Sequence, residues 1–309
     1  MSLLELRGLS VRFETPAGSV KAASDVFLAL DEHETLAIVG ETGCGKSVIA
    51  NAILRLLPEN ASVTGSVIYR GMDLLKMSER EISRIRGREI AIIFQNPSAA
   101  LNPVHRILDQ VSEPLLIHLN LPRHKALHEA DRLLIALGLN GAGRLYPFQL
   151  SGGMNQRAMI ACSSVLRPKI LMADEPTKGL DQSMVENALE LIGSVRDESS
   201  ASLIMITHDL DVALSISERI AVMYCGEIVE MGRTENVLCD PEHPYTKALR
   251  ESMPDRGFKP IPGNTPSMID PPEGCRFHPR CPFKMDICSR EKPSLNNSCG
   301  RYVRCWRCT

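Results

Sequence analysis

The stretch Leu36–Ala50, which reads LAIVGETGCGKSVIA, decides the fold of this chain. Apolar, strand-like residues lead into the segment Gly40–Ser47, and a run compatible with a helix follows it. This is the pattern G-x-x-x-x-G-K-[ST] in the strand–loop–helix context that it requires. Glycines allow successive backbone N–H groups to converge on phosphate oxygens, and the start of the helix adds the positive end of its dipole. The stretch therefore predicts a site for a nucleoside triphosphate; the alternative is a glycine-rich turn with an incidental Lys-Ser.

The composition narrows the class of protein. The chain has 309 residues, enough for one large domain or two. Its formal net charge of −2 does not indicate overall electrostatic attraction to nucleic acid or to anionic lipid. No apolar run approaches the roughly 20 residues of a membrane helix. The N-terminus, MSLLELRGLSVRF, carries acidic residues and lacks the basic and apolar regions of a secretory signal. We therefore expect a cytosolic protein, or at most a peripheral membrane protein.

The pattern of strands and helices predicts an α/β fold. Residues 1–35 alternate polar and apolar residues, which predicts an antiparallel β segment. From residue 97 to about 165 the apolar residues recur at helical spacing. Apolar strands are expected within 88–97, 168–176 and 201–210. Strands that alternate with helices in this way indicate a parallel sheet, which binds its ligands at the carboxyl ends of the strands.

Polar side chains follow these strands at the positions where a ligand would lie. They are Gln95, Asp174, Glu175 and His208. We expect Lys46 to reach the β- and γ-phosphates, and the Ser47 hydroxyl to ligate Mg²⁺. Asp174 is placed to orient the Mg²⁺ ion through water.

The remaining strand-end residues predict hydrolysis. Glu175 is placed to polarise the attacking water, either as a general base or by positioning it. The Gln95 amide can contact both metal and water, and His208 can donate a hydrogen bond to the γ-phosphate or contact Glu175. The alternatives are a solvated pair of carboxylates and a structural histidine.

A second anion-binding helix start is predicted at LSGGMNQR, residues 150–157. The order of the phosphate loop, Gln95, this LSGGM-QR segment, Asp174-Glu175, Leu180-Asp181 and His208 resembles that of an ABC-type ATPase. The resemblance covers residues 1 to about 235.

The resemblance implies a P-loop ATPase with a RecA-like parallel sheet core, an antiparallel β subdomain and a helical subdomain at about 97–165. Residues 236–309 would form an irregular, cysteine-rich C-terminal extension with a structural or regulatory role. Two subunits would sandwich two ATP molecules head to tail, with Asp181 linking the two sites.

The catalytic residues implied are Lys46, Gln95, Glu175 and His208, and the Mg²⁺ ligands are Ser47, Gln95 and Asp174. The expected nucleotide contacts are Phe13 (adenine stacking), Gly40, Glu41, Thr42, Gly43, Cys44, Gly45, Lys46, Ser47, Val48, Ser151, Gly152, Gly153 and Asp181.

Six of the ten cysteines lie in the last 35 residues. They are Cys275, Cys281, Cys288, Cys299, Cys305 and Cys308. Four thiolates can hold Zn²⁺ or an iron–sulfur cluster, and only the pair at 305 and 308 has the C-x-x-C form that a zinc ribbon favours. The tail is also basic, which leaves a solvated surface or a nucleic-acid patch as alternatives. A separate hypothesis concerns Cys44, whose place in the phosphate loop would make the loop sensitive to oxidation or alkylation.

The sequence of the C-terminal tail resembles the C-terminal region of ATPase subunits of oligopeptide and dipeptide importers. The resemblance lies in GCRFHPRCPFKMDIC and, upstream of it, in HPYTKAL and PGNTP. In that group Cys275, Cys281, Cys288 and Cys305 match the ligands of a [4Fe–4S] cluster; Cys299 and Cys308 fall outside the pattern. Zinc, free thiols and disulfides are the alternatives.

The importer resemblance also implies partners. These are a second ABC ATPase subunit, giving a heterodimer or a homodimer, two transmembrane permease subunits and, indirectly, an extracytoplasmic substrate-binding protein. The protein would then lie peripherally on the cytoplasmic face of the inner membrane and act on no nucleic acid. Peptide is the expected cargo, with nickel or a metallophore second. A soluble ABC ATPase that acts on nucleic acid is the remaining alternative.

Overall fold

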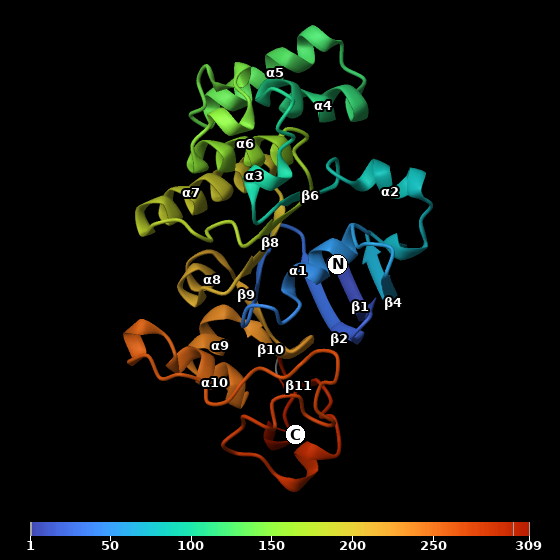
Figure 1. Ribbon diagram of the computed structural model, residues 1–309, viewed down its shortest axis with the longest axis vertical. Coiled ribbons are helices and arrows are strands. Elements are labelled where there is room, and N and C mark those ends of the chain that lie inside the picture. Colours follow the sequence, from blue (N-terminus) through green and yellow to red (C-terminus); the bar gives the residue numbers. More distant parts are fainter. Residues whose placement is uncertain (1, 299, 309) are drawn as a thin grey trace. The chain divides into compact units, whose positions relative to one another are not determined.

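The computed structural model describes residues 2–298 and 300–308, in two compact units. The first unit comprises Met1–Lys76 and Met205–Thr309, and the second comprises Met77–Ile204. Figure 1 shows the chain coloured from its N-terminus to its C-terminus. No helix in the described ranges is both long enough and apolar enough to cross a bilayer.

An antiparallel sheet opens the first unit. Its strands, in spatial order, are β2 (Gly18–Asp31), β1 (Ser2–Thr15), β4 (Ala61–Tyr69) and β5 (Met72–Asp73). The apolar residues Leu4, Leu6, Leu9 and Val11 of β1 are buried, and its register pairs Leu4 with Leu30 of β2. The antiparallel prediction for residues 1–35 is confirmed.

A second set of strands in this unit carries the phosphate loop. All of β3 (Thr35–Val39) is buried, and β3 pairs in parallel with β9 (Arg219–Tyr224). Antiparallel pairing then adds β10 (Glu227–Arg233), β12 (Arg301–Val303) and β11 (Asn296–Ser298). The helices of this unit are α1 (Lys46–Ile53), α8 (Leu210–Ile216), α9 (Thr234–Cys239) and α10 (Pro244–Glu251).

The C-terminal part of the first unit is mostly turns around a shared core. Its short helical turns are η4 (Pro254–Arg256), η5 (Asp286–Ser289) and η6 (Trp306–Cys308); η1 (Leu74–Lys76) ends the N-terminal part. In Figure 1 the orange helices α9 and α10 lie beside β10, and the red coil follows them. Phe277 from that coil is buried in one hydrophobic cluster with Val222, Tyr224 and Tyr245.

The second unit is mainly helical around one parallel strand pair. β6 (Ile90–Ile93) and β7 (Ile170–Asp174) pair in parallel, with Ile93 opposite Ala173. The helices and helical turns are α2 (Glu79–Ile85), α3 (Pro97–Ala100), α4 (Ile107–Leu119), α5 (Arg123–Ala136), η2 (Ala142–Arg144), η3 (Pro147–Gln149), α6 (Gly152–Ser164) and α7 (Gln182–Ser199). The strand β8 (Ser202–Thr207) leads from this unit back into the first.

Candidate functional site

The phosphate loop connects β3 to α1, and close packing explains its glycines. Gly40 has φ +154°, and a Cβ placed on it would lie 2.1 Å from the carbonyl oxygen of Met223. Gly45 has φ +106°, and its Cβ would lie 2.1 Å from the carbonyl oxygen of Ala22. Any side chain at either position would collide with backbone, so the loop can follow this path only with glycine there. Gly45 is also the N-cap of α1 and has no side chain to cap the first N–H groups, which leaves the helix start open to an anion.

Lys46 is held across the mouth of the loop. Its Nζ donates hydrogen bonds to the carbonyl oxygens of Gly40 (2.8 Å) and Glu41 (3.0 Å), and the residue is 4% exposed. Ser47 follows in the first turn of α1, where its carbonyl accepts a hydrogen bond from the Asn51 side chain. The ammonium group thus lies over the loop's own carbonyls, at the point where phosphate oxygens are expected.

The structure argues against a reactive Cys44. The side chain is buried, and burial raises the pKa of its thiol to about 11. Because the thiolate is the reactive form, a buried thiol with a raised pKa is inert at neutral pH. The burial and the raised pKa weigh against an oxidation-sensitive loop, and the hypothesis stays a prediction. The Cys44 carbonyl instead accepts a hydrogen bond from the Gly226 N–H (2.8 Å).

Two further predicted residues belong to the first unit. His208 follows β8 directly and is exposed, just before the Asp209 N-cap of α8. Phe13 lies in β1, opposite Val20 of β2 and Ala61 of β4, and is partly buried. It is therefore an ordinary member of the sheet as well as a candidate for adenine stacking.

In the second unit, parallel pairing brings the predicted metal and water residues to one edge. Because Ile93 is opposite Ala173, Gln95 and Asp174 both leave the strand pair at its carboxyl end. Asp174 is 5% exposed and Glu175 is 6% exposed. Glu175 has φ +44°, an unusual backbone for this residue type and one that often marks functional sites. Its Oε2 lies 3.7 Å from Nζ of Lys178.

The predicted second helix start is also in this unit. Ser151 is the N-cap of α6, and its Oγ accepts a hydrogen bond from the Met154 N–H (3.3 Å). Gly152 is exposed, and a Cβ on it would meet open space. Gly153 follows it, and a Cβ on Gly153 would lie 3.7 Å from the end of the Met184 side chain, an ordinary contact distance.

Two residues connect this region to α7 and to the carboxylates. Asp181 is the N-cap of α7, and the hydrogen bonds that it accepts from Ser183 and then Met184 lower its pKa. Gln156, which the sequence analysis did not single out, donates a hydrogen bond to the carbonyl of Pro176 (2.5 Å) and so joins α6 to the residue after Glu175.

Four C-terminal cysteines line one small cavity of about 20 Å³. They are Cys275, Cys281, Cys288 and Cys305. The Cys275 N–H donates a hydrogen bond to the Cys288 carbonyl (2.8 Å), and burial raises the pKa of the Cys275 thiol to about 12. The cysteines of the described ranges are all free thiols, and no three His, Cys, Asp or Glu side chains there are arranged around a single metal ion.

Of the two other tail cysteines, the structure describes Cys308. It lines a second cavity, with Glu242 and Lys247, and its N–H donates a hydrogen bond to the Cys305 carbonyl (3.1 Å). Burial raises the pKa of its thiol to about 11. Cys299 lies outside the described residues.

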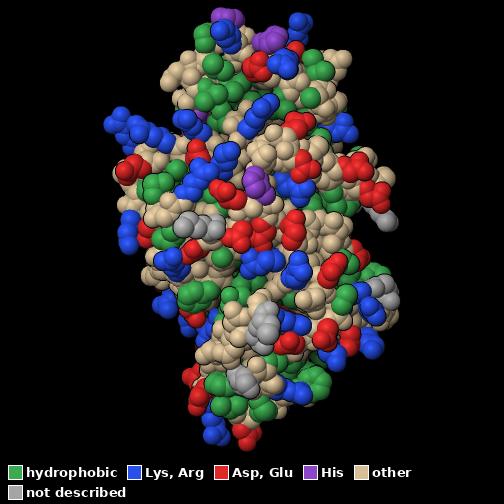
Figure 2. Space-filling model, turned by 180° about the vertical axis from the view of Figure 1, so that it is seen from behind, with side chains coloured by type: hydrophobic (Ala, Val, Ile, Leu, Met, Phe, Trp, Pro, Cys, Tyr) green, Lys and Arg blue, Asp and Glu red, His purple; other side chains and the backbone are tan. Residues whose placement is uncertain are grey.

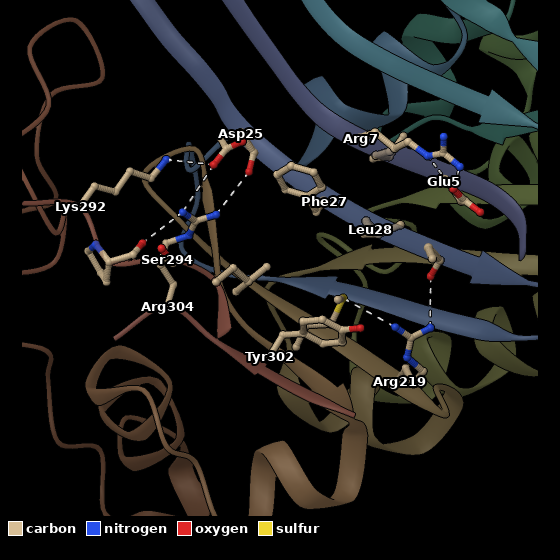
Figure 3. Close-up of a pocket in the computed structure, with 15 residues that line it drawn as sticks. Glu5, Arg7, Asp25, Phe27, Leu28, Arg219, Lys292, Ser294, Tyr302 and Arg304 are labelled. Carbon is tan, nitrogen blue, oxygen red and sulfur yellow. Dashed lines mark hydrogen bonds and ion pairs between the residues drawn. The ribbon is translucent and has the colours of Figure 1, made fainter. Parts of the chain in front are cut away.

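A cavity of about 690 Å³ in the first unit is separate from the phosphate loop (Figure 3). Its walls come from β1, β2, β9, β10, β12 and the C-terminal coil. Its charged side chains are paired: Lys292 and Arg304 both point at Asp25, at 3.5 and 3.7 Å, and Arg219 lies 2.9 Å from Glu34. The cavity contains no residue of the predicted site, and its cations already have carboxylate partners.

A strand that ends in a glycine loop, a Lys-Ser helix start, and carboxylates at the end of a buried strand together define a P-loop nucleoside triphosphatase. The sequence pattern of the family described as "ABC transporter" matches residues 23–178, and that of "Oligopeptide/dipeptide transporter, C-terminal region" matches residues 229–288. The chain belongs to the ABC transporter ATPases, in the oligopeptide and dipeptide group.

Individual relatives agree with this placement. The chain is 39% identical to the oligopeptide transport ATP-binding protein OppD of Escherichia coli, over 99% of this chain and 93% of the relative. It is 40% identical to the dipeptide transport ATP-binding protein DppD of Bacillus subtilis, over 98% and 94%.

A solved structure supports the fold. It is the dimeric ATP-binding cassette MJ0796 with ADP and phosphate, which shares 27% identity and a TM-score of 0.68 over 75% of this chain and 98% of that one. The predicted ABC ATPase fold is confirmed.

Proposed function

We propose that this protein is the ATP-hydrolysing subunit that energises the import of oligopeptides or dipeptides through a membrane permease. The observation that carries the proposal is near full-length similarity to peptide-transport ATPases, together with an intact phosphate loop and strand-end carboxylate pair. A nickel or metallophore importer is the second candidate, because the ATPase itself does not contact cargo. Against a nucleic-acid role stands the match of residues 229–288 to the C-terminal region of oligopeptide and dipeptide transporters; acidic and basic side chains are also interspersed on the face seen in Figure 2.

In this proposal the chain's own residues share the work of hydrolysis. Gly40–Ser47 would bind the phosphates, with Lys46 donating to the β- and γ-phosphates. Ser47, Gln95 and Asp174 would hold Mg²⁺, whose chemistry is to neutralise the developing charge. Glu175 would polarise the attacking water, and its low exposure limits competition from bulk solvent. His208 would donate a hydrogen bond to the γ-phosphate, and Phe13 would stack on adenine.

The proposal extends to the assembly. A second ATPase subunit would supply Ser151 and Gly153 to the nucleotide held by its partner, and Asp181 would connect the two sites. Two permease subunits would anchor the ATPases at the cytoplasmic face of the membrane, below an extracytoplasmic binding protein. Residues 1–235 would be the ATPase domain, with a helical subdomain at about 97–165, and residues 236–309 the C-terminal extension.

We further propose that the extension holds a [4Fe–4S] cluster on the four cysteines that share one cavity. The proposal is supported by the donor set, since the four cysteines line the same small cavity. The cluster would act as a cross-link between distant parts of the tail.

The ATPase proposal is tested with E175Q. We expect turnover to fall by about a hundredfold or more while MgATP still binds, because the carboxylate that polarises water is lost and the phosphate loop is intact. The matched control is E186Q, an exposed glutamate on α7, which should keep wild-type turnover. Unchanged turnover in E175Q would remove Glu175 from its role.

The cargo is tested in proteoliposomes that contain the permease pair and binding protein of the same transporter. ATP-dependent uptake of a labelled peptide supports the proposal. Uptake of nickel without uptake of any peptide would contradict the peptide proposal and support the second candidate, a nickel or metallophore importer.

The cluster is tested by iron, sulfide and zinc analysis of anaerobically purified protein. We expect about four iron and four sulfide per chain, lost in C288S and kept in C239S, since Cys239 is exposed at the end of α9 and does not line the cavity. Stoichiometric zinc without iron would contradict the cluster.

A further inference from the structure

Three segments of the C-terminal extension (residues 236–309) converge on one residue of the phosphate loop, Glu41. Arg280 forms a two-pronged ion pair with its carboxylate, with Nη1–Oε2 at 2.9 Å and Nη2–Oε1 at 3.1 Å. The Thr265 hydroxyl donates to the same Oε2 at 2.7 Å. The Tyr245 hydroxyl accepts a hydrogen bond from the Glu41 N–H at 3.0 Å. The side chain and the backbone of Glu41 are therefore both held from the extension.

Glu41 in turn contacts the phosphate-binding lysine. Its carbonyl oxygen accepts a hydrogen bond from Lys46 Nζ at 3.0 Å, beside the 2.8 Å bond from the same ammonium to the Gly40 carbonyl. A continuous path of hydrogen bonds and one residue's backbone thus runs from Arg280 through Glu41 to Lys46. A shift of Glu41 would move an acceptor that sets the position of this ammonium group.

Arg280 is fixed well enough to act as an anchor. Its side chain is 5% exposed, and its Nε donates to the Pro262 carbonyl at 2.9 Å. Its guanidinium also reaches the Tyr224 hydroxyl at 3.4 Å. A paired arginine fork with these additional partners has one preferred geometry, since each hydrogen bond is directional and charge-assisted.

The turn that carries Arg280 is also packed against the base of the loop. Phe277 packs on Tyr224 and Tyr245, with ring centroids at 5.2 and 5.5 Å. Arg276 lies 3.2 Å from the Glu227 carboxylate and donates a hydrogen bond to the Ser24 hydroxyl at 2.8 Å. The segment between Cys275 and Cys281 is therefore coupled to the phosphate loop through apolar contacts as well as through charge.

We infer that Arg280 is a positioning residue through which the C-terminal extension holds the phosphate loop in its nucleotide-binding conformation, so that affinity for nucleotide depends on the extension. The inference rests on the proposed assignment of Gly40–Ser47 as the nucleotide site. A purely structural role predicts something different: loss of Arg280 would loosen the extension and leave nucleotide affinity unchanged.

The test measures MgADP affinity of the full-length protein by calorimetric titration, and kcat and KM for MgATP. We expect R280M to weaken MgADP binding about tenfold and to raise KM by a similar factor, with kcat at saturation within about twofold. R280K, which keeps the charge but loses the fork, should lie between wild type and R280M. R290M is the matched control, because Arg290 is an exposed arginine elsewhere in the C-terminal extension, and it should bind as wild type does.

The pair is tested by a double-mutant cycle. E41Q should weaken binding about as much as R280M, and the double variant E41Q/R280M little more than either alone, since the ion pair between Glu41 and Arg280 that both variants remove can be lost only once. If R280M does not fold, E41Q and R280K decide the question by the same criteria.

K46A separates the inference from the site assignment. Wild-type MgADP affinity in K46A would overturn the assignment of the nucleotide site, and the inference with it. Loss of binding in K46A with wild-type affinity in R280M and E41Q would overturn the inference alone.

Discussion

The phosphate loop and the C-terminal extension lie in the same unit but are fixed in different ways. The loop depends on glycine at two positions, because Gly40 and Gly45 let its backbone pass close to the backbone carbonyls of Met223 and Ala22. The extension has little regular structure and is fixed by charged side chains that reach distant strands, as Arg276 reaches Glu227 and Arg301 reaches Glu230. A loop that must place N–H groups around phosphate needs a local backbone path, whereas a coil without a large core of its own needs long-range partners.

The largest effect is expected from a substitution in the phosphate loop. G45A would place a Cβ 2.1 Å from the Ala22 carbonyl oxygen at φ +106°, so we expect the free energy of unfolding to fall by roughly 3 kcal/mol or more and nucleotide binding to be lost. Denaturant unfolding and MgADP titration measure both. G193A on α7 is the control, because its Cβ meets no atom within 4 Å, and its stability should not fall. A stable, nucleotide-binding G45A would show that the loop tolerates another path.

The second prediction concerns Glu230, a strand residue that pairs with the C-terminal extension over a long sequence distance. Glu230 of β10 is fully buried, accepts hydrogen bonds from the N–H groups of Glu242 and His243 at 3.0 Å, and pairs with Arg301 at 2.5 Å. We expect E230Q to lower the free energy of unfolding by about 2 kcal/mol, because the amide loses the buried charge that pairs with Arg301 and keeps one acceptor atom where two now accept from the Glu242 and His243 N–H groups.

The matched control for this prediction is E242Q. Glu242 also pairs with Arg301, at 3.4 Å, but its side chain is 40% exposed. Its loss should cost no more than about 0.5 kcal/mol, since water screens the pair. Equal effects in the two variants would mean that burial does not distinguish these ion pairs.

The smallest expected effect concerns Cys44. With its pKa raised to about 11, about one thiol in a thousand is ionised at pH 8, and the side chain is also buried. Iodoacetamide should therefore modify exposed Cys239 long before Cys44, as followed by mass spectrometry of the two peptides. Comparable rates at the two positions would show that the loop opens readily and is less rigid than its packing indicates.

Much of the site could be predicted because its residues follow short motifs at strand ends. Gln95, Asp174 and Glu175 were expected at one sheet edge, and the parallel register of β6 and β7 brings them there. The unusual φ of Glu175 was not predictable, since nothing in its sequence context specifies a left-handed backbone.

The sequence by itself determined the class of protein, the phosphate loop and the order of the motifs, because phosphate binding at a helix start needs particular residues at fixed spacing. It also indicated that the tail cysteines act together. Only the tertiary structure decided which cysteines share a cavity, and that Tyr245, Thr265 and Arg280 meet at Glu41. Those contacts join residues more than 200 positions apart, and such pairs are set by how the coil packs on the strands rather than by any local pattern.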